Sequence, residues 1–255
     1  MQSNRQQDQD QDKALRKQEW QARCDLAAAY RLVALFGWDD LVFTHLSARV
    51  PGPEHHFLIN PYGLLFHEIT ASSLVKVDQE GNVVQAGGLP RVNPAGFTIH
   101  SAIHMGREDA GAVMHLHAAD GVAVSAHKDG LLPLSQTAML CLDHVAYHDY
   151  EGVALNLDER ERLIRDIGDK SMLILRNHGV LTAGNDVPQT FTYLYFLMKA
   201  CEIQVKAQAC GPTWIPSDEA IATTREQSQS LGKAAKLTWP ALLRLLDSKN
   251  PGYAV

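Results

Sequence analysis

Two short apolar segments that carry or precede histidines place the strongest constraint on how this chain folds. Residues 111–117 read Gly-Ala-Val-Met-His-Leu-His, and side chains alternate between the two faces of an extended strand, so His115 and His117 share a face. Residues 171–175 form a second apolar run, which breaks at an Arg-Asn-His-Gly turn. We therefore expect His178 at the end of a buried strand, where functional sites are often built.

These three histidines form a pattern that indicates an open metal site. The Cβ atoms of His115 and His117 would lie roughly 6.5–7 Å apart, so both rings can reach one ion at a metal–nitrogen distance of about 2.0–2.1 Å. With His178 the set has three ligands and no obvious fourth, which is typical of a catalytic rather than a structural zinc site. The alternative is that His115 and His117 are hydrogen-bonded core residues. Two histidines separated by one residue arise readily by chance in a chain with 12 histidines.

Segments with helical and strand periodicity interleave along the chain, and some strands are joined too tightly for a helical crossover. This order predicts an α/β fold class, a single three-layer α/β/α domain in which a central mixed sheet has helices on both faces. We place this domain at residues 14–210. Residues 1–13, rich in Gln and Asp, are expected to form a disordered tail. Residues 211–255 are expected to form a C-terminal extension with one short helix near 240–247.

Composition restricts the partners and the compartment. A formal net charge of −6 without a basic stripe argues against nucleic acid or an anionic membrane as a partner. No apolar run approaches the about 20 residues that cross a bilayer. The four cysteines are scattered, without Cys-x-x-Cys spacing or a secretory signal, so we expect reduced thiols in a cytoplasmic protein.

Several ordered blocks of the sequence resemble the class II aldolase/adducin family, over roughly residues 20–210. They include Gly96-Phe-Thr-Ile-His-Ser-Ala-Ile-His104, the His-x-His strand, Leu173-Ile-Leu-Arg-Asn-His-Gly179 and Ala200-Cys-Glu-Ile-Gln-Val205. Several blocks are more similar to adducin heads than to the sugar-phosphate aldolases. The resemblance implies an α/β/α domain that often assembles as a homotetramer with active sites at subunit interfaces.

The resemblance also implies a cofactor and a substrate class. In the aldolases of this family, three histidines hold a Zn²⁺ that polarises the substrate carbonyl and stabilises the enediolate formed in retro-aldol cleavage. The matching positions here are His115, His117 and His178, so Zn²⁺ is the expected cofactor. Fe²⁺ or Mn²⁺ are alternatives, because three imidazoles do not discriminate among these ions. The expected partner is a small-molecule carbonyl substrate, whose developing negative charge a Lewis acid stabilises.

The chain departs from the aldolase pattern at the positions those enzymes use for proton transfer and phosphate binding. Their acidic general acid/base falls on Gly96, and their phosphate-binding hydroxyl pair falls on Pro94 and Ala95. The Asn of their Gly-Asn-Ile-Ser block falls on His45. Because glycine cannot move a proton and the phosphate pocket is lost, we expect a non-phosphorylated substrate and a different proton-transfer group.

Three residues are candidates for that catalytic group. His100 and His104 lie four residues apart on the helix expected before the His-x-His strand, so they share a face, and histidine titrates near neutral pH. Tyr147 belongs to a polar cluster after another strand. The alternatives are core hydrogen bonding for His100 and a structural network at a subunit contact for Tyr147. The candidate substrate-binding residues are His45, Ser47, Asn60 and Gly63.

Three functions are compatible with this pattern. The first is a divalent-metal-dependent lyase of the class II aldolase type, which acts on a small carbonyl compound by aldol cleavage or a related decarboxylation. The second is a non-catalytic oligomerisation or binding module like an adducin head, favoured by Gly96. The third is a non-haem iron oxygenase, which keeps the three-histidine site but changes the ion and the reaction.

Overall fold

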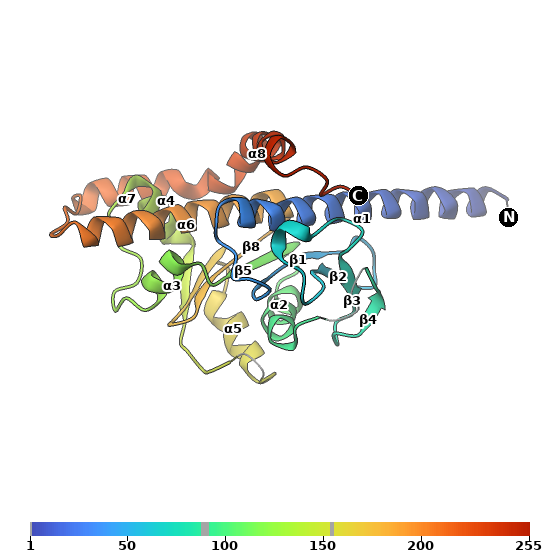
Figure 1. The fold of residues 1–255 in the computed structure, drawn as a ribbon, viewed down its shortest axis with the longest axis horizontal. Helices are drawn as coiled ribbons and strands as arrows, with labels where there is room; N and C mark the ends of the chain where they lie inside the picture. Colours follow the sequence, from blue (N-terminus) through green and yellow to red (C-terminus); the bar gives the residue numbers. More distant parts are fainter. Residues whose placement is uncertain (1, 88–91, 154–155) are drawn as a thin grey trace.

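In the computed structural model, which describes residues 2–87, 92–153 and 156–255, eight strands form one mixed sheet (Figure 1). The strands are β1 (His45–Arg49), β2 (Phe57–Ile59), β3 (Val75–Val77), β4 (Val83–Gln85), β5 (Ala112–Leu116), β6 (Val145–His148), β7 (Met172–Leu175) and β8 (Gly179–Gly184). Their spatial order is β4-β3-β2-β1-β5-β8-β7-β6. Neighbouring strands are antiparallel, except that β6 and β7 are parallel.

Helices cover both faces of this sheet. They are α1 (Gln2–Leu35), α2 (Pro94–Gly106), α3 (Ala119–Ser125), α4 (Gln136–Cys141), α5 (Glu159–Ile167), α6 (Val187–Ala209), α7 (Asp218–Gln227) and α8 (Ala235–Lys249), with short 3₁₀ turns η1 (Phe66–Glu68), η2 (Leu142–His144) and η3 (Ser228–Ala234). Figure 1 shows α1 and α6 against one face, with α8 outside them, and α2 and α5 against the other. This arrangement confirms the predicted fold class. In the described residues, no helix combines the length and the apolar character needed to span a membrane.

Successive side chains of β5 point to opposite faces of the sheet, so they contribute to two separate parts of the core, one under each layer of helices. Met114 and Leu116 pack in one cluster with Phe191 of α6, whereas Val113 packs in a second cluster with Ile103 of α2. All five side chains are buried, and burying one such side chain contributes about 1.5–3 kcal/mol. Because the next side chain on the face of Val113 is a histidine, the packing of this strand also fixes where that imidazole points.

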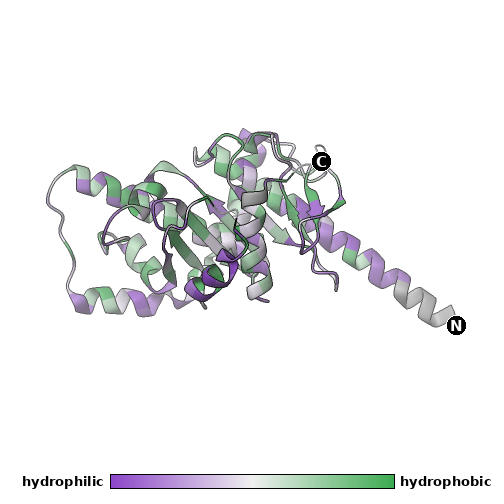
Figure 2. Ribbon diagram, turned by 90° about the horizontal axis from the view of Figure 1, so that it is seen from below, coloured by the Kyte–Doolittle hydropathy of each residue, from purple (hydrophilic) through white to green (hydrophobic). Residues whose placement is uncertain are grey.

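The first helix is longer than composition predicts. A disordered tail is expected over residues 1–13, whereas α1 is helical from Gln2, residue 1 lying outside the described residues. Figures 1 and 2 show α1 projecting beyond the body, and the part of this projection that Figure 2 colours by hydropathy is mostly hydrophilic. Gln, Arg and Lys have good helix propensity, and the segment continues a helix whose other end is packed, so no new nucleus is needed.

The C-terminal extension contains more helix than the one short element predicted near 240–247. Helices α7 and α8 and the turn η3 together occupy residues 218–249. Trp239 fixes the position of α8, because its ring packs on Phe191 with centroids 5.7 Å apart and its Nε1 donates to Asp25 Oδ1 at 3.0 Å. The extension is thus held on the outer side of α1 and α6.

Tyr30 of α1 links this helix to two segments of the sheet. Its fully buried hydroxyl accepts hydrogen bonds from the backbone N–H of Leu46 at 2.8 Å and of Asn60 at 3.2 Å. The same hydroxyl has two acceptors for its proton, the Leu46 carbonyl oxygen at 2.5 Å and Asn60 Oδ1 at 2.8 Å. Burial raises the pKa of Tyr30 well above its ordinary value, so the hydroxyl keeps its proton.

Removal of this hydroxyl is expected to destabilise the fold. Tyr30→Phe keeps the ring but leaves the N–H groups of Leu46 and Asn60 without their acceptor, so the free energy of unfolding should fall by about 1–3 kcal/mol. Chemical denaturation measures this. Tyr62→Phe is the control, because the half-buried Tyr62 makes no hydrogen bond through its hydroxyl among the described residues. An equal loss in both variants would contradict the role assigned to Tyr30.

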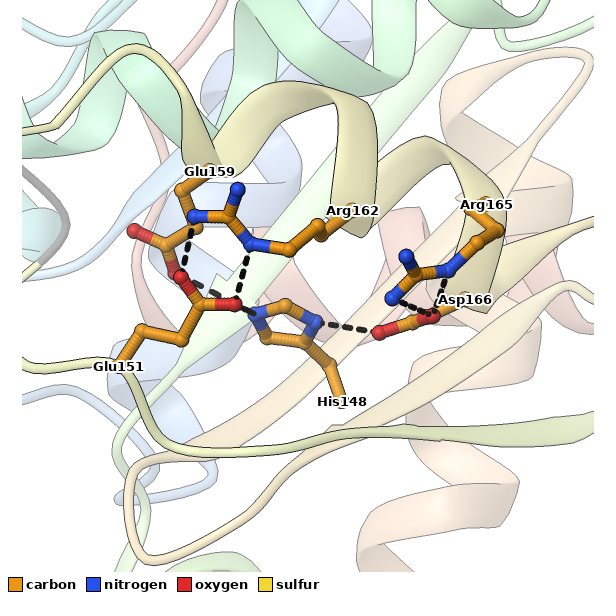
Figure 3. A network of polar contacts seen from close by, with 6 residues as sticks. All are labelled: His148, Glu151, Glu159, Arg162, Arg165 and Asp166. Carbon is orange, nitrogen blue, oxygen red and sulfur yellow. Dashed lines mark hydrogen bonds and ion pairs between the residues drawn. The ribbon is translucent and has the colours of Figure 1, made fainter.

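A buried histidine at the end of β6 organises a polar network (Figure 3). His148 Nδ1 lies 2.7 Å from Asp166 Oδ2 of α5. Its Nε2 lies 3.4 Å from a carboxylate oxygen of Glu159 and 3.9 Å from one of Glu151. Arg162 of α5 binds Glu151 in turn. The network therefore fastens the loop after β6 to α5.

Asp166 should make the stability of this network depend on pH. Burial raises the pKa of its carboxyl, but hydrogen bonds from His148 and Arg165 outweigh burial and leave the pKa below its usual value of 3.8. A depressed native pKa contributes stability above the unfolded-state pKa, and this contribution is lost as the pH falls through the native pKa. Asp166→Asn should thus lower the free energy of unfolding by about 1–3 kcal/mol at pH 7, and the difference should narrow below about pH 4.

Urea titrations between pH 7 and pH 3 measure this difference. Asp169→Asn is the matched control, because the Asp169 side chain is 90% exposed and its ion pair with the ammonium of Lys170 is long, at 3.6 Å. A gap between wild type and Asp166→Asn that stays constant over the whole pH range would argue against the role given to this carboxylate.

Candidate metal centre

Strand β5 and the turn between β7 and β8 bring His115, His117 and His178 together. His115 lies within β5, and His117 directly follows its last residue, Leu116. His178 lies in the turn, immediately before Gly179. A Cβ at Gly179 would overlap the carbonyl oxygen of Leu116, so only glycine lets the turn approach β5 this closely. The sequence Asn-His-Gly therefore sets the third imidazole beside the other two.

The three rings converge as a shared metal ion requires. One ligand atom from each histidine lies within 4.8 Å of the others, and the ring centroids are 4.8 Å apart in every pair. The Nε2 atoms of His115 and His117 are 3.0 Å apart. Two nitrogens on one tetrahedral zinc ion would be roughly 3.3–3.4 Å apart, so the observed spacing fits with small adjustments. The triad can hold a divalent ion.

Hydrogen bonds on the far side of two rings determine where their protons lie. His115 Nδ1 is 3.0 Å from the carbonyl oxygen of Val180, and His117 Nδ1 is 3.1 Å from Asp40 Oδ2. Both oxygens are acceptors, so both Nδ1 atoms carry the proton. In the neutral rings the two Nε2 lone pairs then face each other at 3.0 Å and repel. A cation between them would turn this repulsion into ligation, and carbonyl or carboxylate partners of this kind orient metal-binding histidines.

Burial keeps His115 and His178 in the form that binds metal. It lowers the pKa of His178 to about 4, with the neighbouring His117 and His148 acting in the same direction. Burial also holds the pKa of His115 well below its ordinary value, as do the nearby His178 and His117. A neutral imidazole is the metal ligand, so His115 and His178 need release no proton at neutral pH.

A cavity of about 410 Å³ opens beside the three histidines. The loop after β6, which the His148 network of Figure 3 holds, contributes Tyr150 and Val153 to its wall. Phe43 and Ile99 add apolar surface from other segments. Among the described residues that line the cavity, none is Lys or Arg. The site thus combines an open side of the histidine triad with a pocket of small-molecule size.

His45, predicted as a substrate-binding residue, forms part of this cavity wall. It lies directly opposite His115 in the register of β1 and β5 and is only 4% exposed. Burial, with the nearby His117, lowers the pKa of His45 to about 3. A Cβ at Gly96 would come closer than 3.0 Å to atoms of the His45 ring. The imidazole of His45 therefore occupies the space that a side chain at position 96 would need.

His100, His104 and Ser47 form a buried chain behind this wall. Ser47 Oγ lies 2.6 Å from His100 Nδ1 and 2.7 Å from His104 Nε2. His104 Nδ1 lies 2.9 Å from the carbonyl oxygen of Ala110. Burial lowers the pKa of His104 to about 4 and that of His100 well below its ordinary value. None of the three is among the described residues that line the cavity, so their roles in proton transfer and substrate binding stay predictions.

Tyr147, Asn60 and Gly63 also lie outside the described lining of the cavity. The Tyr147 hydroxyl accepts a hydrogen bond from the backbone N–H of Leu131 at 3.0 Å, which is a structural contact. Asn60 is bonded to Tyr30. Gly63 is exposed and has a φ of 110°, a turn conformation that favours glycine. The structure therefore does not bring these three candidates to the histidine triad.

Sequence reasoning missed Asp40 and Tyr150. Asp40 pairs with His117 across 77 positions of the chain, and no local pattern distinguishes it from the preceding Asp39. Tyr150 has its ring centroid 6.5 Å from that of His178. Only the three-dimensional arrangement identifies these contacts. The side chains of Pro94 and Ala95, predicted in place of phosphate-binding hydroxyls, lie outside the described part of the structure.

Known sequences match this chain over most of its length. A family model described as "Class II Aldolase and Adducin N-terminal domain" matches residues 24–205. A Caulobacter vibrioides protein named "Putative aldolase class 2 protein" is 58% identical, over 92% of this chain and 93% of its own. Alpha-adducin of Rattus norvegicus is 50% identical over 91% of this chain, which corresponds to 33% of the adducin chain.

Solved structures share the fold. An aldolase II superfamily protein from Pseudomonas syringae superposes with a TM-score of 0.90 at 52% identity, over 93% of this chain and 96% of its own. L-fuculose 1-phosphate aldolase from Glaciozyma antarctica superposes with a TM-score of 0.80 at 31% identity, over 92% of each chain. With the family match and these relatives, the chain belongs to the class II aldolase and adducin family.

Proposed function

We propose that the chain is a divalent-metal-dependent lyase of the class II aldolase type that acts on a small, non-phosphorylated carbonyl compound. His115, His117 and His178 would hold the ion, with Zn²⁺ expected and Fe²⁺ or Mn²⁺ as alternatives. Bound there, the ion would act as a Lewis acid toward a carbonyl oxygen and stabilise the negative charge that develops when a carbon–carbon bond breaks.

The facing nitrogens of His115 and His117, 3.0 Å apart with their protons held on the far side of each ring, carry this proposal. Such a pair is unfavourable in a core without a cation, whereas it is the arrangement that two metal ligands need. The adjoining cavity of about 410 Å³ supplies the open position that separates a catalytic site from a closed structural one.

The lining of the cavity supports a substrate without a phosphate group. Proteins usually bind phosphate with Arg or Lys side chains, and no such residue is found in the described lining. The fuculose-phosphate aldolase with the same fold takes its name from a phosphorylated sugar. We therefore expect this chain to prefer a hydroxylated ketone or aldehyde over its phosphate ester.

Exposed apolar side chains that line the cavity support a subunit contact near the site, and we propose that this contact belongs to a homotetramer. Phe43, Tyr150 and Val153 line the cavity and are 42%, 56% and 71% exposed. Apolar surface gathered at one place commonly marks an interaction site. We also expect a cytoplasmic location, which the four free cysteines support.

Metal content tests the proposal. Protein purified without added metal should carry about one divalent ion per chain by elemental analysis, because the triad offers one site. EDTA should abolish the cleavage of non-phosphorylated hydroxyketones, and Zn²⁺ should restore it. His178→Ala should weaken metal binding by about 100-fold or more, whereas His67→Ala, which removes an exposed histidine, should leave it unchanged.

Two other results would favour the other functions. Metal-free protein whose properties do not respond to EDTA would favour a binding module, to which 50% identity with alpha-adducin lends support. Bound iron together with substrate-dependent oxygen uptake would favour an oxygenase on the same scaffold.

Asp40 should tune the affinity of the site for metal. Asp40→Ala removes the acceptor of the His117 Nδ1–H bond, so the ring loses its fixed orientation and metal affinity should fall by about 10- to 100-fold. Competition with a chromophoric chelator measures this fall. Asp39→Ala is the matched control, since it deletes the neighbouring carboxylate and leaves His117 untouched. Equal affinity in the two variants would rule out the orienting role of Asp40.

A further inference from the structure

The cavity wall next to the histidine triad contains three buried polar atoms that have no hydrogen-bond partner among the described residues. They are Thr44 Oγ1 and both ring nitrogens of His45. Thr44 is 2% exposed and His45 is 4% exposed, and both residues line the cavity. Native proteins pair nearly all buried polar atoms, because an unpaired one is costly. The missing partner is therefore expected to enter through the cavity.

The backbone places both side chains on the same wall. In a regular strand Thr44 and His45 would point to opposite faces. Thr44 instead has a φ of 66°, a left-handed conformation that β-branched residues rarely adopt. This departure from the extended conformation breaks the alternation just before β1 begins, so adjacent side chains can both line the cavity.

The His45 ring is held in place on two sides. Gly96 of α2 provides the space for the ring, since a Cβ there would come closer than 3.0 Å to it. The ring of His100 meets it edge-on, with centroids 6.0 Å apart. His100 bonds Ser47 through Nδ1, and no hydrogen bond joins its ring to either ring nitrogen of His45 among the described residues.

We propose that Thr44 and His45 form a polar pair that recognises a hydroxyl group of the substrate, adjacent to the group bound at the histidine triad. A hydroxyl both donates and accepts, and a neutral imidazole with a threonine hydroxyl offers both complementary roles. A methyl group in the same place would leave the Thr44 hydroxyl and the facing nitrogen of His45 unpaired, and sites of this kind discriminate strongly against such analogues. The pair thus sets specificity, and this inference rests on the proposed metal-dependent function.

Two small chelators that differ by one hydroxyl test the pair. Acetohydroxamate and glycolohydroxamate both bind a metal ion through two oxygens, but glycolohydroxamate carries a hydroxymethyl group where the other carries a methyl. Their dissociation constants are measured from the visible spectrum of the Co²⁺-loaded protein. The wild type should bind glycolohydroxamate roughly threefold to tenfold more tightly. His45→Leu should remove this preference, and His45→Gln, which keeps a donor and an acceptor, should retain part of it.

Two further variants guard against a folding defect in His45→Leu. Thr44→Val is isosteric and removes one hydroxyl, so it should reduce the preference. Gly96→Ala keeps all three polar atoms but displaces the His45 ring, so it should reduce the preference as well. His56→Leu is the matched control outside the cavity and should behave as the wild type.

The possible failures are distinguishable. If the wild type binds both chelators equally, or if His45→Leu and Thr44→Val keep the full preference, the recognition role is overturned while the metal site stands. If the wild type takes up no Co²⁺, or takes it up and binds neither chelator, the proposed function is overturned and the recognition role with it.

Discussion

The facing Nε2 atoms of His115 and His117, 3.0 Å apart, are the constraint on which the rest of the site depends. The orientation of the two rings is set by hydrogen bonds at their Nδ1 atoms, which lead to the carbonyl oxygen of Val180 on β8 and to the carboxylate of Asp40. The first contact requires the β5–β8 register, in which Leu116 lies opposite Val180. A shift of one residue would turn His115 toward the other layer of the core, so the pairing of the sheet determines the chemistry of the site.

Local chemistry made the histidine triad predictable, and long-range contacts left the rest of the site hidden. Strand alternation gives His115 and His117 a common face, and the glycine after His178 marks a close turn, so both signals are present in a few consecutive residues. Asp40 meets His117 across 77 positions, and nothing near it in the sequence signals that contact. The same limit explains the C-terminal extension, whose helix α8 is placed by the contact of Trp239 with a distant phenylalanine.

The hydrogen-bond partners of the ring nitrogens, rather than the residue type, distinguish the structural histidines of this protein from the functional ones. His104 is buried but bonds Ser47 and a backbone carbonyl through its two ring nitrogens, and the buried His100 bonds Ser47 through Nδ1 while its Nε2 has no partner in the described structure. His45 is almost as deeply buried, yet neither of its ring nitrogens has a partner in the described structure. Composition and spacing cannot show this difference, because it depends on what lies opposite each ring. An unpaired imidazole in a cavity wall is therefore stronger evidence of a binding role than its place in a motif.

The glycine at position 96 has a different meaning in this context. Taken alone, the resemblance to the aldolases of the family implies that an acidic catalytic group is missing at this position, which favours a chain without catalytic activity. In the structure, the space that a side chain would need at Gly96 holds the ring of His45. The two positions are coupled by size, since a larger residue at 96 and an imidazole at 45 cannot occupy the same volume. The imidazole at position 45 thus fills the volume that a side chain at position 96 would need, and it gives the cavity wall a polar group beside the triad.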